Sequence, residues 1–200
     1  LESFWLDPSP AFTSGAQGAV SGRADVVVVG AGFTGLSGAL ALAKRGASVV
    51  VLEAGRVVGE ASGRNGGHCS SGLAHDFLGL AARIGLDQAR AFYQAYDAAF
   101  HTVESLVGQE NIACDFKRVG KIKLAAKQEH YEKLSRTCEL MRREVDPDVE
   151  MLSADRLRSE MGSTKFHGGL LQKASAQMHV GKFGVGLAHA AARAGAHIYE

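Results

Sequence analysis

Three glycines in the spacing Gly-x-Gly-x-x-Gly directly follow a run of four valines, Val26–Val29. Such a run is typical of a strand that is buried on both faces. Helical spacing of apolar residues extends from Thr34 to Arg45, and a second apolar run, Val49–Leu52, ends at Glu53. Strand, tight turn, helix and strand in this order predict a βαβ unit with parallel strands, and therefore an α/β, Rossmann-like fold.

The three glycines, Gly30, Gly32 and Gly35, each have a separate physical role. The first permits a tight turn, the second lets the backbone approach a diphosphate, and the third lets helix and strand pack closely. The N-terminus of the helix offers free N–H groups and partial positive charge to phosphates. Glu53, about 20 residues further on, is placed to accept hydrogen bonds from an adenosine ribose and to repel a 2′-phosphate. The pattern predicts the ADP half of an FAD or NAD site.

The segment after the second strand favours FAD over NAD. Residues 55–72 are rich in glycine and serine, and a loop of this length in a compact domain is usually functional. Residues 59–68 combine small side chains with the guanidinium of Arg64 and the amide of Asn65. Such a loop can follow an extended dinucleotide and place donors near its flavin end, while Asn65 orients neighbouring backbone. An NAD-dependent dehydrogenase is the alternative.

Composition argues against several other functions. The 200 residues carry a net charge of +1, which gives no reason to expect nucleic acid or a charged membrane surface as a partner. Three widely spaced cysteines without a CxxC motif argue against a disulfide framework or a metal site, and favour a reducing, cytoplasmic location. The apolar stretch from Ala24 to Ala43 contains a charge and several glycines, so we expect strand, turn and helix there and no membrane span.

Downstream of the loop, the periodicity predicts helices and two short strands. We expect a helix over residues 87–108, an amphipathic helix over residues 127–145, and a short helix capped by Ser153. Residues 112–116 and 121–125 resemble paired strands around Gly120. The inward face of the helix over residues 87–108 is expected to consist of Phe92, Tyr96, Phe100, Val103 and Val107. The inward face of the helix over residues 127–145 is expected to consist of Tyr131, Leu134, Cys138 and Met141.

Both ends of the chain have a distinctive pattern. Residues 1–23 hold two of the three prolines and indicate an irregular arm, which we expect Phe4 and Trp5 to pin to the body. Residues 191–200 repeat the pattern of residues 42–53, a helix end, a glycine and then a strand that ends in glutamate. Because the second copy stops inside its strand, we expect this chain to be the N-terminal portion of a longer protein, or to be completed by another polypeptide.

Residues 24–68 resemble the N-terminal region of FAD-dependent oxidoreductases of the D-amino-acid oxidase type, a group that includes glycine and sarcosine oxidases. The resemblance rests on ADVVVVGAGFTGLSGALALAKRGASVVVLEAGRVVGEASGRNGGH. The segments ASGRNGG and FWLDPSP are most similar to the gamma-glutamylputrescine oxidoreductase branch. From Met178 onward the chain resembles the point where this family returns from its substrate domain to its flavin domain, with Val180 where the family usually has proline. The resemblance covers nearly the whole chain and is specific from residue 24 to residue 68.

The resemblance implies a domain plan, a cofactor and its contacts. Residues 1–23 would form an arm, residues 24–110 and 177–200 two segments of the FAD-binding domain, and residues 111–176 part of an α+β substrate domain. The cofactor would be FAD. Its expected contacts are Gly30, Gly32, Phe33, Thr34, Gly35, Glu53, Ala54, Ser62, Arg64, Asn65, Gly66, Gly67 and His68.

The resemblance also implies an activity, the oxidation of the carbon–nitrogen bond of a small amine or amino acid. Hydride would pass to the flavin, the imine would hydrolyse, and dioxygen or another acceptor would reoxidise the flavin. We predict no catalytic residue, because this family takes most of its substrate contacts from segments that would follow residue 200. A non-catalytic flavin-binding subunit or fragment is the alternative to an enzyme.

Four further side chains have competing interpretations. His68 is expected beside the flavin ring, with a solvated side chain or a covalent link to flavin as the alternatives. Cys69 is expected to be a small buried thiol, since no charged partner for it is evident. Lys121 and Lys123 alternate with apolar residues, so we expect them on the wet face of a strand rather than in a patch for an anionic substrate.

Overall fold

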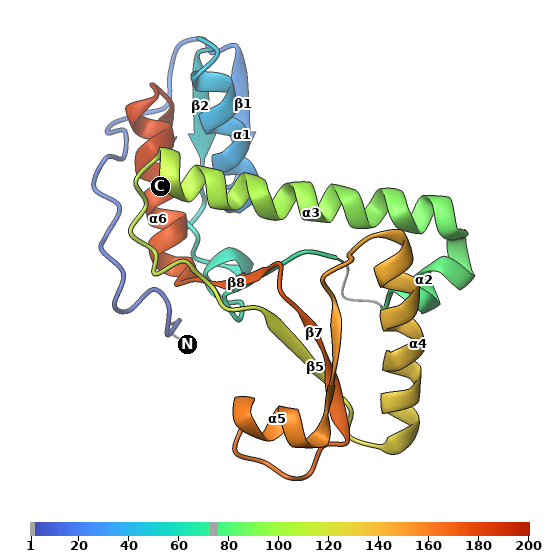
Figure 1. Cartoon of the computed structure of the whole chain (residues 1–200). Coiled ribbons are helices and arrows are strands. Elements are labelled where there is room, and N and C mark those ends of the chain that lie inside the picture. The colour runs from blue at the N-terminus through green and yellow to red at the C-terminus, as the bar shows by residue number, and fades with distance from the viewer. Residues whose placement is uncertain (1–2, 73–75) are drawn as a thin grey trace. The chain divides into compact units, whose positions relative to one another are not determined.

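The computed structural model describes residues 3–72 and 76–200, which belong to two compact units. The first unit comprises residues 1–67, 104–116 and 178–200, and the second comprises residues 68–103 and 117–177. Figure 1 labels the helices and several of the strands of these units. Each unit contains both helices and β-sheet, so the mixed α/β class that the sequence predicts is confirmed.

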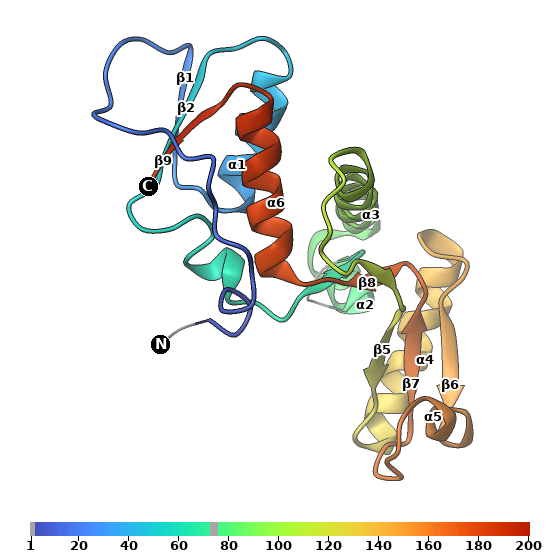
Figure 2. The same cartoon turned by 90° about the vertical axis from the view of Figure 1, so that its left-hand side faces the viewer.

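A parallel three-stranded sheet lies at the centre of the first unit. Its strand order is β1-β2-β9, with β1 at Val26–Val29, β2 at Val49–Leu52 and β9 at His197–Tyr199. Helix α1 (Phe33–Ala43) joins β1 to β2, and α6 (Val180–Arg193) leads into β9. Figure 2 shows both helices on the same side of the strands, as two right-handed crossovers in one direction require. The βαβ prediction is confirmed.

The second face of β1 differs from the expectation for a strand buried on both sides. Val27 is 57% exposed and Val29 is 87% exposed, whereas Val26 and Val28 are half-buried. The physical reason is that α1 and α6 cover the same face of the sheet. An unbroken valine run therefore predicted the strand correctly, but it was wrong about the burial of the strand on both faces.

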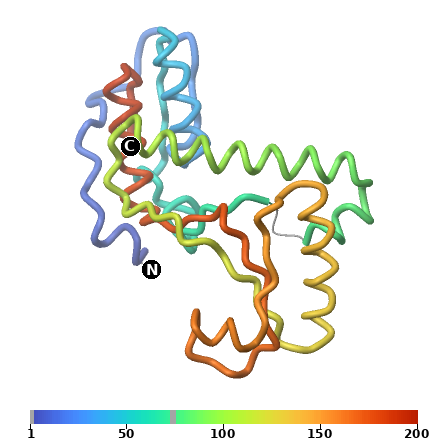
Figure 3. The backbone as a smooth tube through the Cα atoms, viewed as in Figure 1, coloured from blue at the N-terminus to red at the C-terminus, as the bar shows by residue number. Residues whose placement is uncertain are grey.

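The N-terminal arm follows the length of α6 (Figure 3). The ring of Trp5 lies 5.1 Å from that of His179, edge to face, and the ring of Phe12 lies 5.0 Å from that of His189. The prediction that Trp5 pins the arm is confirmed. The same prediction for Phe4 is wrong, because its side chain is 77% exposed and its ring packs on Trp5 itself.

The second unit contains two antiparallel sheets and helices packed against them. The first sheet has the order β3-β8-β4, that is His68–Ser70, Ser175–Gln177 and Lys117–Arg118. The second has the order β5-β7-β6, that is Lys121–Leu124, Gly168–Gln172 and Glu150–Ser153. The helices are α2 (Phe77–Ile84), α4 (Gln128–Glu144), α5 (Ala154–Glu160) and the part of α3 (Leu86–Gln109) up to Val103. Over the described parts of the chain, no helix is both long and apolar enough to cross a membrane.

The predicted pairing of residues 112–116 with residues 121–125 is wrong. Residues 112–116 form no strand, and β5 pairs with β7, while β4 pairs with β8. The partner of β5 therefore lies some fifty residues further along the chain rather than across Gly120. Apolar alternation marks a strand but carries no information about its partner.

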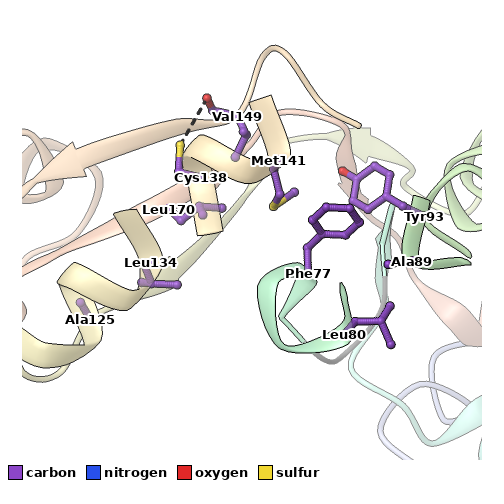
Figure 4. Close-up of a cluster of buried hydrophobic side chains, with 10 residues drawn as sticks. All are labelled: Phe77, Leu80, Ala89, Tyr93, Ala125, Leu134, Cys138, Met141, Val149 and Leu170. Atoms are coloured by element: carbon purple, nitrogen blue, oxygen red, sulfur yellow. Dashed lines mark hydrogen bonds between the residues drawn. The ribbon is translucent and has the colours of Figure 1, made fainter. Parts of the chain in front are cut away.

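The core of the second unit corrects the predicted face of the long helix. Tyr93, with Ala89 and Phe100, points inward, whereas Phe92 is 50% exposed and Tyr96 is 44% exposed. Figure 4 shows Tyr93 beside Phe77, with the two rings 5.9 Å apart and edge to face. The buried stripe of α4 is confirmed at Leu134, Cys138 and Met141, and Ser153 caps α5 by accepting a hydrogen bond from the N–H of Arg156.

The buried hydroxyl of Tyr93 makes the stability of this unit depend on pH. It donates a hydrogen bond of 3.1 Å to Asp146 and accepts one of 3.4 Å from the amide of Gln172. Burial and then the charge of Asp146 raise the pKa of Tyr93 to about 12. The folded state therefore holds this proton above pH 10, where an unfolded tyrosine releases it, and stability is lost as pH rises from about 10 to about 12.

Tyr93→Phe should remove this dependence. We expect the unfolding midpoint of the unmodified protein in urea to fall more steeply between pH 10 and pH 12 than that of Tyr93→Phe. Titration of tyrosine absorbance should show one group that ionises late in the unmodified protein and is missing from the variant. Parallel midpoint curves for the two proteins would contradict the assignment.

Candidate functional site

The glycine turn after β1 brings the start of α1 against the strand. Gly30 has a φ of +96°, a conformation that glycine adopts without strain, and its N–H donates a 2.8 Å hydrogen bond to the carbonyl of Leu52. A Cβ atom at Gly35 would collide with the carbonyl oxygen of Gly30 and lie 3.1 Å from Cγ1 of Val28. The absence of a side chain at Gly35 is therefore what allows α1 to pack this closely on β1.

The N-terminus of α1 is bare of carboxylates. Gly32 occupies the cap position and supplies no side-chain hydrogen bond, and no acidic residue lies in the first turn. The hydroxyl of Ser62 accepts a 3.1 Å hydrogen bond from the N–H of Phe33. A Cβ atom at Gly32 would lie only 3.0 Å from that hydroxyl oxygen. Partial positive charge thus remains at this end of the helix for an anion.

Glu53 connects the end of β2 to the glycine turn. One carboxylate oxygen accepts a 2.7 Å hydrogen bond from the N–H of Ala31, and the other accepts a 2.9 Å bond from the N–H of Gly55. A carboxylate offers about four acceptor positions, so these two bonds leave about two for another donor. The acidic side chain and the start of α1 therefore lie at the same edge of the sheet.

The loop after β2 is held by its own side chains. The amide of Asn65 donates to the carbonyls of Ala61 and Ser62, at 3.3 and 2.9 Å, and its oxygen accepts a 3.0 Å bond from the N–H of Gly67. Arg64 donates a 2.9 Å bond from Nε to the carbonyl of Gly59. These bonds fix the backbone that carries Ser62 toward α1.

The structure places the predicted residues in two groups. Most lie in the first unit, where Glu53 meets the glycine turn and Ser62 meets α1. Thr34 lies exposed in the first turn of α1, and Ala54 and Gly66 are exposed in the loop. His68 instead begins the second unit, exposed on β3 and paired with Gln177, and the buried Cys69 follows it as predicted.

Three parts of this arrangement were not predicted from the sequence. Ala31 contributes both backbone groups, its N–H to Glu53 and its carbonyl to the N–H of Val58 at 3.0 Å. In the arm, the hydroxyl of Ser3 donates to the carbonyl of Gly63. Each of these contacts has a backbone group on at least one side, and side-chain patterns carry no signal for such groups. For the arm, only the FWLDPSP segment indicated a role.

His179 caps the N-terminus of α6. The ring Nδ1 of His179 accepts a 3.2 Å hydrogen bond from the backbone N–H of Lys182. The backbone N–H of His179 donates a 2.7 Å bond to the carbonyl of Cys114. Val180 consequently occupies the first helical position. Proline is tolerated there because that N–H needs no partner within the helix, so valine and proline serve this position equally well.

Comparisons with known proteins agree with this geometry. Residues 25–200 match the model of the DAO family, described as FAD dependent oxidoreductase. The chain is 34% identical over 176 residues to gamma-glutamylputrescine oxidoreductase of Escherichia coli (strain K12), which covers 88% of this chain and 41% of that protein. Glycine oxidase from Geobacillus kaustophilus superposes with a TM-score of 0.69 at 28% identity, over 90% of this chain and 47% of that one.

A further solved structure shares the fold alone. L-Amino acid deaminase from Proteus myxofaciens, in complex with anthranilate, has a TM-score of 0.76 at 20% identity, over 96% of this chain and 41% of that one. The chain therefore spans less than half the length of these three relatives. Since the family model matches most of its residues, the chain belongs to the FAD dependent oxidoreductase (DAO) family.

Proposed function

We propose that this chain supplies the ADP-binding part of an FAD site in an enzyme that oxidises the carbon–nitrogen bond of an amine or amino acid. The observation that carries the proposal is the meeting of two features at one edge of the sheet. These are a helix N-terminus with no acidic residue in its first turn, and the carboxylate of Glu53, which accepts a hydrogen bond from the N–H of Ala31 just before that helix.

The residues around the start of α1 fit a diphosphate. Gly32 supplies no side-chain cap, and the first turn offers N–H donors without an acidic residue of its own to compete for them. The hydroxyl of Ser62 lies against the same turn. Phosphate oxygens would accept hydrogen bonds from these N–H groups and from Ser62, in a position where the helix dipole favours negative charge.

Glu53 would hold the adenosine ribose. The acceptor positions that Ala31 and Gly55 leave free on its carboxylate suit the two hydroxyl groups of that sugar. A 2′-phosphate would meet the same negative charge and be repelled. The loop that contains Arg64, Asn65, Gly66 and Gly67 would then follow the dinucleotide toward its flavin, with His68 near the ring.

The proposed activity rests on the named relatives. One of them is a gamma-glutamylputrescine oxidoreductase and another is a glycine oxidase. When bound, FAD supplies a hydride acceptor for the carbon next to the substrate nitrogen. The part of the chain described above would bind and orient this cofactor. The substrate would be a small amine or amino acid, with dioxygen or another acceptor receiving the electrons.

A spectrum tests the cofactor and the activity together. Protein expressed from its complete reading frame should be yellow after purification and release FAD on denaturation. Anaerobic addition of gamma-glutamylputrescine, glycine, sarcosine or a D-amino acid should bleach the flavin absorbance with one of these compounds. A colourless protein that releases nicotinamide dinucleotide would overturn the proposal, and retained flavin without bleaching by any amine would refute its catalytic part.

The loop should matter for cofactor retention through Asn65. Asn65→Ala removes three hydrogen bonds that hold the backbone next to Ser62. At about 1 kcal/mol or less for each partly exposed bond, we expect FAD to bind about tenfold more weakly. Fluorescence titration of the flavin-free protein with FAD measures this change. Asn111→Ala, at another turn of the first unit, serves as the control and should leave the affinity unchanged.

A further inference from the structure

The second unit contains a cavity of about 290 Å³ that the proposed function does not use. It lies between α2, α4 and the sheet β5-β7-β6, and none of the residues proposed to contact FAD lines it. A volume near 300 Å³ is at the lower end of the range for small-molecule sites in proteins. The cavity is therefore large enough for a small organic molecule.

Most of its wall is apolar. Figure 4 shows the main apolar side chains of this wall, which are Phe77 and Leu80 from α2, Leu134 and Met141 from α4, and Leu170 from β7. Aromatic and aliphatic side chains around a concave space are typical of sites that bury the hydrocarbon part of a ligand. The wall thus favours a ligand with an apolar body.

Two lysines on β5 also line this cavity. Lys121 is half-buried, and Lys123 is exposed. The expectation that both lie on a wet strand face is therefore wrong for Lys121. Burial and then the positive charge of Lys123 lower the pKa of the Lys121 ammonium. Within residues 3–72 and 76–200, Lys121 has no carboxylate partner, so a cation lies against an apolar wall without a counter-charge.

The other polar groups of the cavity already have partners. Asp76 caps α2 by accepting a 2.7 Å bond from the N–H of Gly79, and it forms a 2.9 Å ion pair with Lys133. Thr137 donates a 3.0 Å bond to the carbonyl of Lys133, and the hydroxyl of Tyr93 is bonded to Asp146. With the carboxylate neutralised, the net charge offered to a ligand is positive.

We propose that this cavity binds a small organic carboxylate, with its charged group at Lys121 and its apolar body between α2 and α4. The carboxylate supplies the counter-charge that Lys121 lacks, and Lys123 adds a second, more distant attraction. The apolar body removes the cavity wall from water. This site goes beyond the proposed function, because it uses other residues and requires no flavin.

Calorimetric titration with phenylacetate tests the proposal, with phenylacetamide as its uncharged counterpart. The flavoprotein should bind phenylacetate at least about tenfold more tightly than phenylacetamide, since only the acid pairs with an ammonium. Lys121→Met keeps the apolar stem but removes the charge, and should weaken phenylacetate binding by about tenfold or more while leaving phenylacetamide unaffected. Lys121→Arg keeps the charge and should retain the preference for the acid.

Lys117→Met is the matched control, because Lys117 is an exposed lysine on β4, the strand that precedes β5 in the sequence, and does not line the cavity. It should bind phenylacetate as the unmodified protein does. Flavin absorbance and far-ultraviolet circular dichroism, measured on the same samples, should be equal in all variants, which separates this site from the FAD site. The proposal is overturned if phenylacetate does not bind, if the amide binds equally well, or if Lys121→Met binds phenylacetate unchanged.

Discussion

Gly35→Ala is expected to abolish detectable FAD binding and to lower the free energy of unfolding by roughly 1–3 kcal/mol. The added methyl group would meet the carbonyl oxygen of Gly30 and the side chain of Val28. Neither can withdraw, because the first is backbone in the turn itself and the second belongs to β1. Helix α1 must therefore shift away from the strand, and the N–H groups proposed to hold the diphosphate shift with it.

Gly38→Ala is the matched control for this prediction. Gly38 lies in the same helix, and a Cβ atom built on it meets nothing within 4 Å. Alanine is a better helix former than glycine by about 0.5–1 kcal/mol, so this variant should be slightly more stable and bind FAD normally. Urea unfolding and FAD titration measure both effects. Equal FAD affinity in the two alanine variants would refute the role of the close helix–strand contact.

Glu53→Ala should weaken FAD binding by about 10- to 100-fold, the range expected when hydrogen bonds to a charged group are lost. The carboxylate accepts bonds from the N–H groups of Ala31 and Gly55, and we propose that it also accepts bonds from the ribose hydroxyls. Glu53→Gln keeps the shape and one acceptor oxygen, so its affinity should lie between those of the alanine variant and the unmodified protein. The measurement is the dissociation constant of FAD from the flavin-free protein.

Asp25→Ala is the control that distinguishes two causes of weaker FAD binding in Glu53→Ala, the loss of bonds within the protein and the loss of bonds to FAD. Asp25 also accepts a hydrogen bond from a backbone N–H, that of Ser48 at 2.8 Å, but it lies at the opposite end of β1. Its removal should lower stability by less than Glu53→Ala does, because one bond is lost rather than two, and should leave FAD affinity unchanged. If both variants lose the same affinity, Glu53 acts only through the stability of the sheet.

The sequence predicted the first unit well because its constraints are local. Strands β1 and β2 lie within the predicted bounds, and α1 begins and ends within two residues of them. Two glycines of the turn are required for local reasons, Gly30 by its positive φ and Gly35 by its contact with the carbonyl of Gly30. The spacing of the glycines along the chain is therefore set by the geometry of the turn between β1 and α1.

The second unit was harder to predict because its organisation depends on distant residues. Strand β5 was expected to pair across Gly120, but its partner β7 lies beyond α4, β6 and α5. In α3 the inward side chain is Tyr93 rather than its neighbour Phe92. Aromatic residues at both positions fit a helical period, and only packing against α2 decides which of them turns inward.

Some contacts around the candidate site could not be predicted from sequence patterns. Glu53 was identified from its distance along the chain, but its bond to the N–H of Ala31 involves backbone that any residue carries. The cavity beside Lys121 was also missed. Alternation along β5 predicted solvent on that face, whereas α2 and α4, which cannot be placed from the strand's own sequence, enclose it.

A binding titration of the flavin-free protein with FAD, FMN and ADP tests the proposed ADP site most directly. FAD contains the diphosphate and the adenosine that the start of α1 and Glu53 would hold, whereas FMN lacks the adenosine. FAD should therefore bind far more tightly than FMN, and ADP should displace FAD competitively. FMN binding as tight as that of FAD, with no displacement by ADP, would contradict the proposed site.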